Sequence, residues 1–292
     1  MPRARVNRSN GAGPAGSDKM GKPVKNRQIG EREVMSKNPA KDFGPIAADY
    51  AFFETHATEP ENDARAYAEH LAGILPAEGP IRLLDFGCGS GSFSLRFLQQ
   101  TGWPADRLRL TLVEPVEAAR QQAIVRLREK TVHPIIDAAT LPDGVAGSFD
   151  VVLANHSLYY VPALPGLTTR LLAALAPAGV FVTAIAGRTN ALVAFWIAGF
   201  GALGREVPHH TSEDVEAALQ ASGAAYDKQV VPYELTFPDT EENRMHILRF
   251  LLGDNLAQMP LQQLLSMFDQ HAHAGRIEMR TGCDHFTVRA KP

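Results

Sequence analysis

The sequence predicts an α/β fold in which a mainly parallel sheet carries helices on both faces. Short, apolar, β-rich runs alternate with helical segments from residue 42 onward, and a glycine-rich loop joins one strand to the helix after it. Hydrophobic residues make up 45% of the 292-residue chain, enough to bury a large core. The alternation indicates parallel strands, because a right-handed crossover helix returns the chain to the same edge of the sheet.

The order of the predicted elements follows this alternation as far as residue 187. The expected strands are 81–85, 109–114, 133–136, 149–154 and 180–185, and the expected helices are 93–100, 116–130 and 165–176, the last ended by residues 177–179. These strands, each followed by a helix or a loop, predict one continuous sheet.

Beyond residue 187 the alternation stops. Residues 188–210 are apolar and glycine-rich without a clear strand, and Thr211–Asp214 is typical of a helix start. Two closing strands are expected at 226–237 and 284–289, antiparallel to each other, and Pro232 makes the first an edge or interrupted strand. Between them, helices are expected at 241–252 and 260–271, where they form a lid.

The charge distribution separates the N-terminus from the rest of the chain. Residues 1–41 hold ten basic and three acidic residues and few large apolar ones, which predicts a disordered, solvated basic tail. One domain is expected over 42–292, with a core at about 75–187 and substrate-cap segments at about 42–74 and 188–280.

Composition excludes several classes of function. The net charge of −3 does not favour binding to nucleic acid or to a membrane, and no apolar run is long enough for a membrane span or a signal peptide. The two cysteines are not in a metal-spaced cluster, which fits a reducing cytoplasm. His209, His210, His271 and His273 are interpreted as surface histidines because no acid or cysteine cluster accompanies them, so no metal site is expected.

The glycine-rich loop is the most informative motif. Asp85, Gly87, Gly89 and Gly91 follow the pattern Asp-x-Gly-x-Gly-x-Gly, with Cys88 between the first two glycines. A dinucleotide fingerprint would need its third glycine at position 92 and does not need the acid. The pattern favours a ligand whose methionine portion lies across the loop, with its ammonium group engaged by Asp85 directly or through water. A tight strand–helix turn alone would explain only one or two of the glycines.

Polar residues also follow the next three strands. Glu114 ends the second strand and is placed to accept hydrogen bonds from two ribose hydroxyls. Asp137 and Ala138 follow the third strand and are placed to contact adenine, although an aspartate after a strand is also a common turn residue. Asn155 and His156 fall at the carboxyl end of the fourth strand, where open α/β sheets bind ligands.

These elements, in this order, resemble the class I S-adenosylmethionine-dependent methyltransferases over residues 75–185. The resemblance implies a Rossmann-like sheet with helices on both faces and helical lid elements at the N- and C-terminal sides. It also implies S-adenosyl-L-methionine as methyl donor, with S-adenosyl-L-homocysteine as product. The cofactor-binding residues would be Asp85, Gly87, Cys88, Gly89, Gly91, Glu114, Asp137, Ala138 and Asn155.

A narrower resemblance lies outside this core. The segment from Phe53 to Glu59 is similar to the Phe-x-x-His-Ser-Thr-Glu segment of histamine N-methyltransferases, and Leu158–Val161 matches that family's motif after the fourth strand. Residues 211–214, the helix end at Gly223 and the closing run at 286–288 fall in similar order. The likeness extends from about residue 42 to the C-terminus and is thin between the motifs.

This second resemblance implies roles for individual residues. Glu59 matches the family's substrate-binding glutamate, whose carboxylate pairs with a cationic amine, and His156 stands where the family has a substrate-contacting glutamine. Phe195 falls near an aromatic wall position that is a tryptophan in the family. Gly282 replaces a substrate-binding asparagine, and Ala119 replaces a glutamine near the cofactor. The resemblance therefore predicts a pocket similar in plan and different in detail.

The residues themselves agree with methyl transfer to nitrogen. The enzyme must align a lone pair with the methyl group and exclude water, and an amine must be neutral to attack, so His156 could take its proton. The predicted catalytic residues are therefore His156 and Glu59. The predicted substrate-binding residues are Phe53, Glu59, His156, Tyr159, Tyr160 and Phe195.

Each of these residues also has a purely structural interpretation. Glu59 would be an acid stabilised by a helix N-terminus, since it precedes Pro60 and a helical stretch. His156 would be a hydrogen-bonded packing residue. Tyr159, Tyr160 and Phe195 would be core aromatics.

The leading hypothesis is therefore a small-molecule N-methyltransferase acting on an amine, imidazole or amino-acid-like substrate. The alternatives are C-, S- or O-methylation of a metabolite such as an indole or a thioether, and a non-catalytic module that binds S-adenosylmethionine. A nucleic-acid methyltransferase is disfavoured, because residues 155–158 read Asn-His-Ser-Leu where amino-methylating DNA enzymes have an Asn-Pro-Pro-Tyr type signature. Both a monomer and a homodimer are compatible with the sequence.

Overall fold

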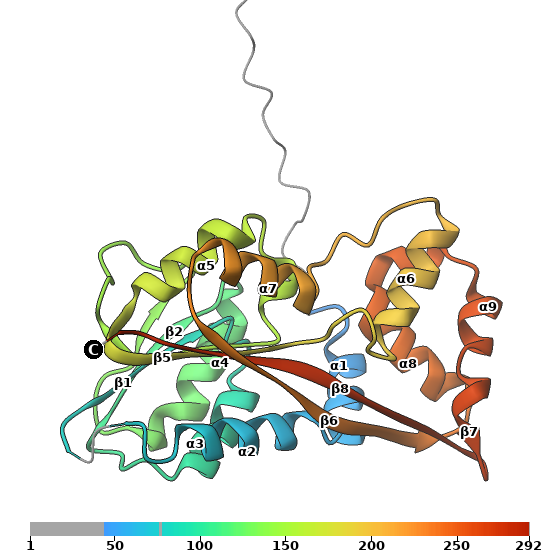
Figure 1. The fold of residues 1–292 in the computed structure, drawn as a ribbon. Coiled ribbons are helices and arrows are strands. Elements are labelled where there is room, and N and C mark those ends of the chain that lie inside the picture. Colours follow the sequence, from blue (N-terminus) through green and yellow to red (C-terminus); the bar gives the residue numbers. More distant parts are fainter. Residues whose placement is uncertain (1–43, 76–77, 292) are drawn as a thin grey trace, which may run out of the picture. The chain divides into compact units, whose positions relative to one another are not determined.

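The computed structural model describes residues 44–75 and 78–291. The predicted basic tail at 1–41 lies outside the described residues. Within the described part of the chain, eight strands form one sheet in the order β3-β2-β1-β4-β5-β8-β6, with β7 paired to β8 (Figure 1). The strands are β1 Ile81–Phe86, β2 Leu108–Val113, β3 Ile136–Ala138, β4 Phe149–Asn155, β5 Leu175–Ile185, β6 Tyr226–Pro238, β7 Ala272–His273 and β8 Arg276–Arg289.

Strands β1 to β5 are parallel, and β8 is antiparallel to both β5 and β6. The α/β prediction is thus confirmed, as is the antiparallel pairing of the two closing strands. Helices lie on both faces of the sheet, as Figure 1 shows, with α2, α3 and α4 on one face and α5 and α7 on the other. These helices are α2 Glu59–Leu71, α3 Ser92–Thr101, α4 Glu117–Leu127, α5 Leu164–Ala173 and α7 Ser212–Ala221.

A second group of helices lies beside the end of the β6–β8 ribbon that carries β7 (Figure 1). It comprises α1 Ala47–His56, α6 Val193–Ala202, α8 Glu241–Leu252 and α9 Leu261–Ser266. These helices pack on one another, and α1 also packs on β6, where Ala57 bridges to Leu235. The predicted cap segments are therefore packed together, and their action as a lid remains a prediction.

Two hydrophobic clusters hold these layers together. One fills the face under α2, α3 and α4 and includes Tyr67, Phe97 and Leu110. The other continues from the opposite face of the sheet into the cap helices and includes Phe181, Phe237 and other large side chains. Because the second cluster is continuous, the cap and the sheet share a core on that side.

Several element boundaries differ from the sequence predictions for local reasons. The third strand begins at Ile136 rather than 133, because Pro134 has no N–H to donate to the ladder. Helix α5 ends at Ala173, and Pro177–Gly179 lies inside β5, where the register with β4 shifts. A Cβ on Gly179 would lie 2.8 Å from the Phe149 carbonyl oxygen, so glycine permits this irregular crossing.

Longer-range contacts change three further predictions. The closing strand starts at Arg276 rather than 284, because β8 pairs with β6 along the full length of β6. The apolar stretch 188–210 contains helix α6, and the helix expected at 260–271 ends at Ser266 before a short 3₁₀ turn. Thr211 does cap α7, through a capping box with Asp214.

Candidate active site

The loops predicted to bind the cofactor meet at one edge of the sheet. Phe86 pairs with Val113, Val113 pairs with Ala138, and Asp85 pairs with Leu153. The residues that follow β1, β2 and β4 therefore leave the sheet side by side, at the carboxyl ends of the strands, where ligands of open α/β sheets bind.

The glycines of the first loop need the conformations that only glycine adopts readily. Gly87, Gly89 and Gly91 have φ values of +73°, +53° and +76°. A Cβ on Gly87 would lie 2.3 Å from the Ser157 Cβ, and one on Gly91 would lie 3.0 Å from Ala123. A Cβ on Gly89 would meet no atom within 4 Å. Two of the glycines thus permit close packing of the protein, and Gly89 borders open space that a ligand could fill.

The other cofactor-binding candidates surround this loop. Glu114 accepts hydrogen bonds from the backbone N–H groups of Gly89, at 3.1 Å, and Val116, at 2.9 Å. Asp137 forms a 2.7 Å ion pair with Arg120. The Ala138 carbonyl accepts a hydrogen bond from the Glu114 N–H. The two carboxylates predicted to contact ribose and adenine are therefore brought to one edge, where other protein groups hold them.

Asp85 and Cys88 are the two buried ionisable residues of this loop. The Asp85 carboxylate accepts a hydrogen bond from the Ser94 hydroxyl. Burial raises the pKa of Asp85 to about 7, against the effect of that hydrogen bond. The Cys88 thiol is also buried, and burial raises its pKa. Asp85 faces helix α3, so its predicted contact with the ammonium group of the ligand remains a prediction.

A second group of polar side chains lies next to the end of β4. Glu59 and Asp63 are four residues apart and share one face of α2. His156 follows β4. Cys283 and His285 are two residues apart on β8, so their side chains lie on the same face of that strand. We call Glu59, Asp63, His156, Cys283 and His285 the polar cluster.

Asp63 is the centre of the polar cluster. Its side chain is 1% exposed, and its two carboxylate oxygens accept hydrogen bonds from the Nε2 atoms of His156, at 2.9 Å, and His285, at 2.8 Å. Burial raises the pKa of Asp63, but the hydrogen bonds from the two histidines outweigh it and hold that pKa below the ordinary value. Asp63 is therefore a buried carboxylate that orients both imidazole rings.

His285 is buried against Tyr67, with ring centroids 4.6 Å apart. Its Nδ1 has no hydrogen-bond partner within the described part of the chain. An N–H left without an acceptor in a buried site is costly, so the ring carries its proton on Nε2, facing Asp63. His285 thereby supports the Asp63 carboxylate.

His156 connects Asp63 with the aromatic side of the site. Its Nδ1 lies 3.1 Å from the Tyr159 hydroxyl, and its Nε2 lies 3.6 Å from a Glu59 oxygen. Burial lowers the pKa of His156, but the Glu59 and Asp63 carboxylates outweigh it and raise that pKa to about 9. The backbone of His156 has a φ of +49°, which few residues other than glycine adopt. The chain therefore holds this imidazole in an unusual conformation between two acids.

Glu59 is the first residue of α2, so it lies at the positive end of the helix dipole, as its structural interpretation requires. It also faces the polar cluster: the Cys283 thiol donates to Glu59 Oε1 across 3.2 Å. Burial raises the pKa of Glu59, partly offset by the charge of His156 and by hydrogen bonds from Cys283 and Tyr233. The structural and functional interpretations of Glu59 are therefore compatible.

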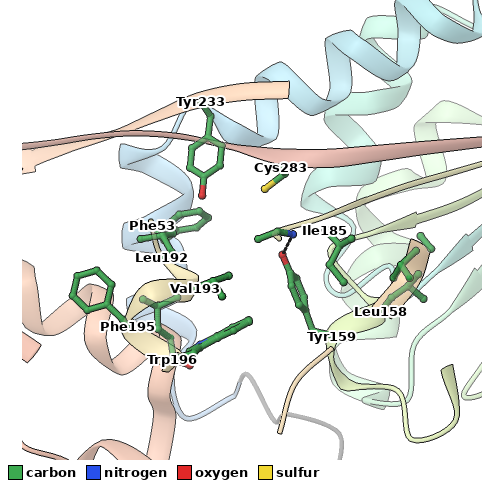
Figure 2. Close-up of a cluster of buried hydrophobic side chains, with 14 of the residues drawn as sticks. Phe53, Leu158, Tyr159, Ile185, Leu192, Val193, Phe195, Trp196, Tyr233 and Cys283 are labelled. Atoms are coloured by element: carbon green, nitrogen blue, oxygen red, sulfur yellow. Dashed lines mark hydrogen bonds between the residues drawn. The ribbon is translucent and has the colours of Figure 1, made fainter. Parts of the chain in front are cut away.

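Aromatic residues enclose the cluster on the side of the cap. The Tyr159 hydroxyl accepts a 2.7 Å hydrogen bond from the Ala186 N–H, and the Tyr159 ring meets Trp196 edge-on, with centroids 5.4 Å apart. In Figure 2 the Tyr233 hydroxyl and the Cys283 sulfur point toward the same space, near Phe53. Of the adjacent residues Phe195 and Trp196, it is therefore Trp196 that contacts Tyr159.

The remaining aromatic candidates are mainly packed in the core. Phe195 packs against Phe268 in the cap, with ring centroids 4.6 Å apart. Tyr160 packs against His209, at 4.9 Å. His210 Nε2 donates a 2.8 Å hydrogen bond to the Val161 carbonyl. His209 packs on Tyr160 and Trp196, and both His209 and His210 are partly exposed, so they lie at the margin of this aromatic group.

Sequence reasoning missed Asp63, Tyr233, Cys283 and His285. Asp63 could have been predicted, because a residue four positions after Glu59 on a helix lies on the same face as Glu59. The other three lie on β6 and β8, and no local sequence pattern indicates that these strands pack next to α2.

Three side chains of the polar cluster could together hold a metal ion. Among the described residues, the ligand atoms of Glu59, His156 and Cys283 lie within 4.8 Å of one another.

None of the helices in the described ranges combines the length and apolar character needed to cross a membrane.

Comparison with known proteins agrees with this geometry. Malonyl-[acyl-carrier protein] O-methyltransferase from Enterobacter lignolyticus is 30% identical over 142 residues, covering 49% of this chain and 53% of that protein. Trans-aconitate 2-methyltransferase from Mycolicibacterium gilvum is 31% identical over 117 residues, covering 39% of this chain and 41% of that protein. The chain thus matches about half of the length of these curated relatives, or less.

Similar solved structures share the fold. The YcgJ protein from Bacillus subtilis superimposes with a TM-score of 0.51 at 15% identity, covering 78% of this chain and 99% of that one. The protein family described as "Methyltransferase domain" matches residues 60–229 of this chain, which is more than half of its length. The matched segment runs from the first turn of α2, through the glycine-rich loop and the end of β4, into β6. This chain therefore belongs to the methyltransferase domain family.

Proposed function

We propose that this protein is an S-adenosylmethionine-dependent methyltransferase that methylates a nitrogen of a small amine, imidazole or amino-acid-like molecule. The observation that carries the proposal is the polar cluster at the end of β4, in which Glu59 lies beside the His156–Asp63 pair. The resemblance of Phe53–Glu59 to histamine N-methyltransferases supports the same acceptor class.

The loop edge fits S-adenosylmethionine as the methyl donor. The space next to Gly89 admits close approach of a ligand to the backbone, and Asp85 and Glu114 supply acids for its ammonium and ribose groups. When bound, S-adenosylmethionine would supply an electrophilic methyl group to the acceptor lone pair, with the carbon–sulfur bond breaking in line and S-adenosylhomocysteine leaving. The protein's own part is to position the acceptor, remove its proton and exclude water.

Replacing Gly89 by alanine is expected to weaken the binding of S-adenosylmethionine by at least about tenfold, because the new Cβ projects into the ligand space. Gly102→Ala is the matched control, since Gly102 has a φ of +60° and equally open surroundings at the end of α3. Both variants bear a similar backbone strain of about 1–2 kcal/mol. Calorimetric titration measures the two affinities, and equal losses would contradict the assignment of this space to the cofactor.

The charges of the polar cluster favour a cationic acceptor. Glu59 and Asp63 are two buried carboxyl groups, and His156 is the cation that lies between them. With both carboxylates ionised, the cluster keeps a net negative charge that burial makes costly. An ammonium or imidazolium group placed against Glu59 would neutralise it.

The same cluster supplies a proton acceptor of suitable strength. An ordinary imidazole, with a pKa of about 6.5, is too weak a base to deprotonate an alkylammonium with a pKa of about 10. The two acids raise the pKa of His156 to about 9, close to that of the amine. The proton of the bound ammonium can then pass to neutral His156, which leaves the nitrogen lone pair free to attack.

A second candidate is methylation of an oxygen, and two observations favour it. The relative from Enterobacter lignolyticus is named an O-methyltransferase. A protonated His156 could also pair with the carboxylate of an acidic acceptor, which needs no base. Methylation of carbon or sulfur finds no comparable support in the polar cluster.

Product analysis over a range of pH separates the candidates. The full chain is incubated with S-adenosylmethionine carrying a deuterated methyl group and with a panel of amines, imidazoles, alcohols and carboxylic acids, and the label is located by mass spectrometry.

For an amine, kcat/KM is expected to rise about tenfold per pH unit and to level above about 9, because one proton must leave the complex. For a carboxylate it is expected to fall above about 9, as His156 loses its charge. Label on oxygen alone would replace the nitrogen proposal, and no transfer to any acceptor would overturn both.

A further inference from the structure

Cys283 is the one member of the polar cluster for which methylation of an amine supplies no role. It is fully buried on β8, and its thiol donates a hydrogen bond to Glu59. A thiol is a weak hydrogen-bonding group and adds little to the binding of an ammonium. As a thiolate, however, it is a strong ligand for soft and borderline metal ions.

The donor atoms around Cys283 form a set that such an ion prefers. One sulfur, one imidazole nitrogen and one carboxylate oxygen, from Cys283, His156 and Glu59, lie within 4.8 Å of one another. An oxygen of Asp63 lies 2.9 Å from His156 Nε2, so a further carboxylate borders the set. Zn²⁺ binds these three ligand types, at about 2.0–2.3 Å, and tolerates mixed tetrahedral sets.

We propose that Glu59, His156 and Cys283 bind a single Zn²⁺ ion, which takes the place of the protons now held between these side chains. The Cys283 thiol proton and the His156 Nε2 proton lie between these side chains, and both are released to solvent when the sulfur and the nitrogen bind the metal. Three ligands leave one coordination position open, as in catalytic zinc sites.

Small movements are enough to close the site around the ion. Ligand atoms about 2.0–2.3 Å from a tetrahedral metal lie roughly 3.3–3.8 Å apart, so no pair needs to approach by more than about 1.5 Å. Glu59 Oε2 and His156 Nε2 are already 3.6 Å apart. His156 Nδ1 would keep its 3.1 Å contact with the Tyr159 hydroxyl, which would orient the ring in the way that outer hydrogen bonds orient metal-bound imidazoles.

The ion and the cationic acceptor would occupy the same negative site, so Zn²⁺ is inferred to inhibit methyl transfer by competing with the acceptor. This consequence rests on the proposed function, whereas binding of the ion does not. A test of binding therefore uses the full chain without any acceptor.

Cobalt titration tests the site directly, because Co²⁺ replaces Zn²⁺ and gives a thiolate charge-transfer absorption in the near ultraviolet when a cysteine is a ligand. One equivalent of Co²⁺ is expected to give this absorption with the wild-type chain, and Zn²⁺ is expected to abolish it. Cys283→Ser should lose the absorption. Cys88→Ser is the matched control and should keep it, because the Cys88 thiol contacts the Gly89 carbonyl and is not among the ligand atoms gathered with Glu59 and His156. No absorption with the wild-type chain, or equal absorption with both variants, would overturn the proposal.

Two further measurements keep the test decisive if Cys283→Ser does not fold. His156→Asn leaves the thiol in place and is expected to weaken Co²⁺ binding by at least about tenfold, as loss of one ligand does. In the methylation assay, stoichiometric Zn²⁺ should raise the apparent KM of the acceptor. Unchanged Co²⁺ affinity in His156→Asn would reject the site. An absent methylation product combined with normal Co²⁺ binding would reject only the proposed function.

Discussion

Replacing Glu59 by glutamine is expected to lower kcat/KM for the amine acceptor about 100-fold, mainly through a higher KM. The substitution keeps the shape of the side chain and removes the charge that would pair with the ammonium, and loss of a buried charge pair costs about 2–5 kcal/mol. Steady-state kinetics with the acceptor identified by product analysis measures this effect. Affinity for S-adenosylmethionine should change by less than about twofold, because Glu59 lies on α2 and not on the loop edge.

The same substitution should leave the fold intact. Burial raises the pKa of Glu59, which means that the folded protein bears a cost for the ionised group. Glutamine removes that cost and still accepts a hydrogen bond from Cys283. Glu61→Gln is the matched control on the same helix, because Glu61 is exposed and pairs with Arg96 outside the polar cluster. A KM that stays the same in Glu59→Gln, or that rises equally in Glu61→Gln, would remove Glu59 from the acceptor site.

Replacing His156 by asparagine is expected to lower kcat about 1000-fold, in the range of 10²- to 10⁴-fold that a positioned proton acceptor contributes. Asparagine is chosen because it adopts positive φ more readily than most residues, so the backbone at +49° can stay as it is. The measurement is single-turnover kinetics at saturating acceptor, with the melting temperature and the affinity for S-adenosylmethionine as checks on folding.

The pH profile distinguishes loss of a base from loss of packing. In the wild-type chain the neutral form of His156 becomes dominant above its pKa of about 9, so the rate rises with pH up to that value. The variant should lose this contribution to the profile. His133→Asn is the control, since the His133 imidazole bonds the Asp106 carbonyl and has no bond to the polar cluster in the described part of the chain. A slower variant that keeps the wild-type profile would show that His156 supports structure and does not accept the proton.

The cofactor edge was predictable from the sequence because its pattern is local. Gly87, Gly89 and Gly91 follow one strand directly, and Glu114 follows the next, and parallel strands bring their carboxyl ends together whatever the rest of the chain does. The alternation of strands and helices likewise determined the α/β class and the succession of strands and helices along the chain from β1 to β5. The sequence also marked Glu59 and His156 as candidates, although it left their contact open.

Only the tertiary structure decided what surrounds those two residues. Glu59 and Cys283 are 224 positions apart, and His285 and Asp63 are 222 apart, so no periodicity within one element relates them. Their contact depends on the packing of α2 next to the long β6–β8 ribbon. The sequence did not predict the full length of β8, because its first half depends on pairing with β6. Hydrophobic pattern and glycine spacing act over a few residues and determine strands, helices and loops. The charge state of a buried acid or imidazole depends on partners that only the folded chain brings together.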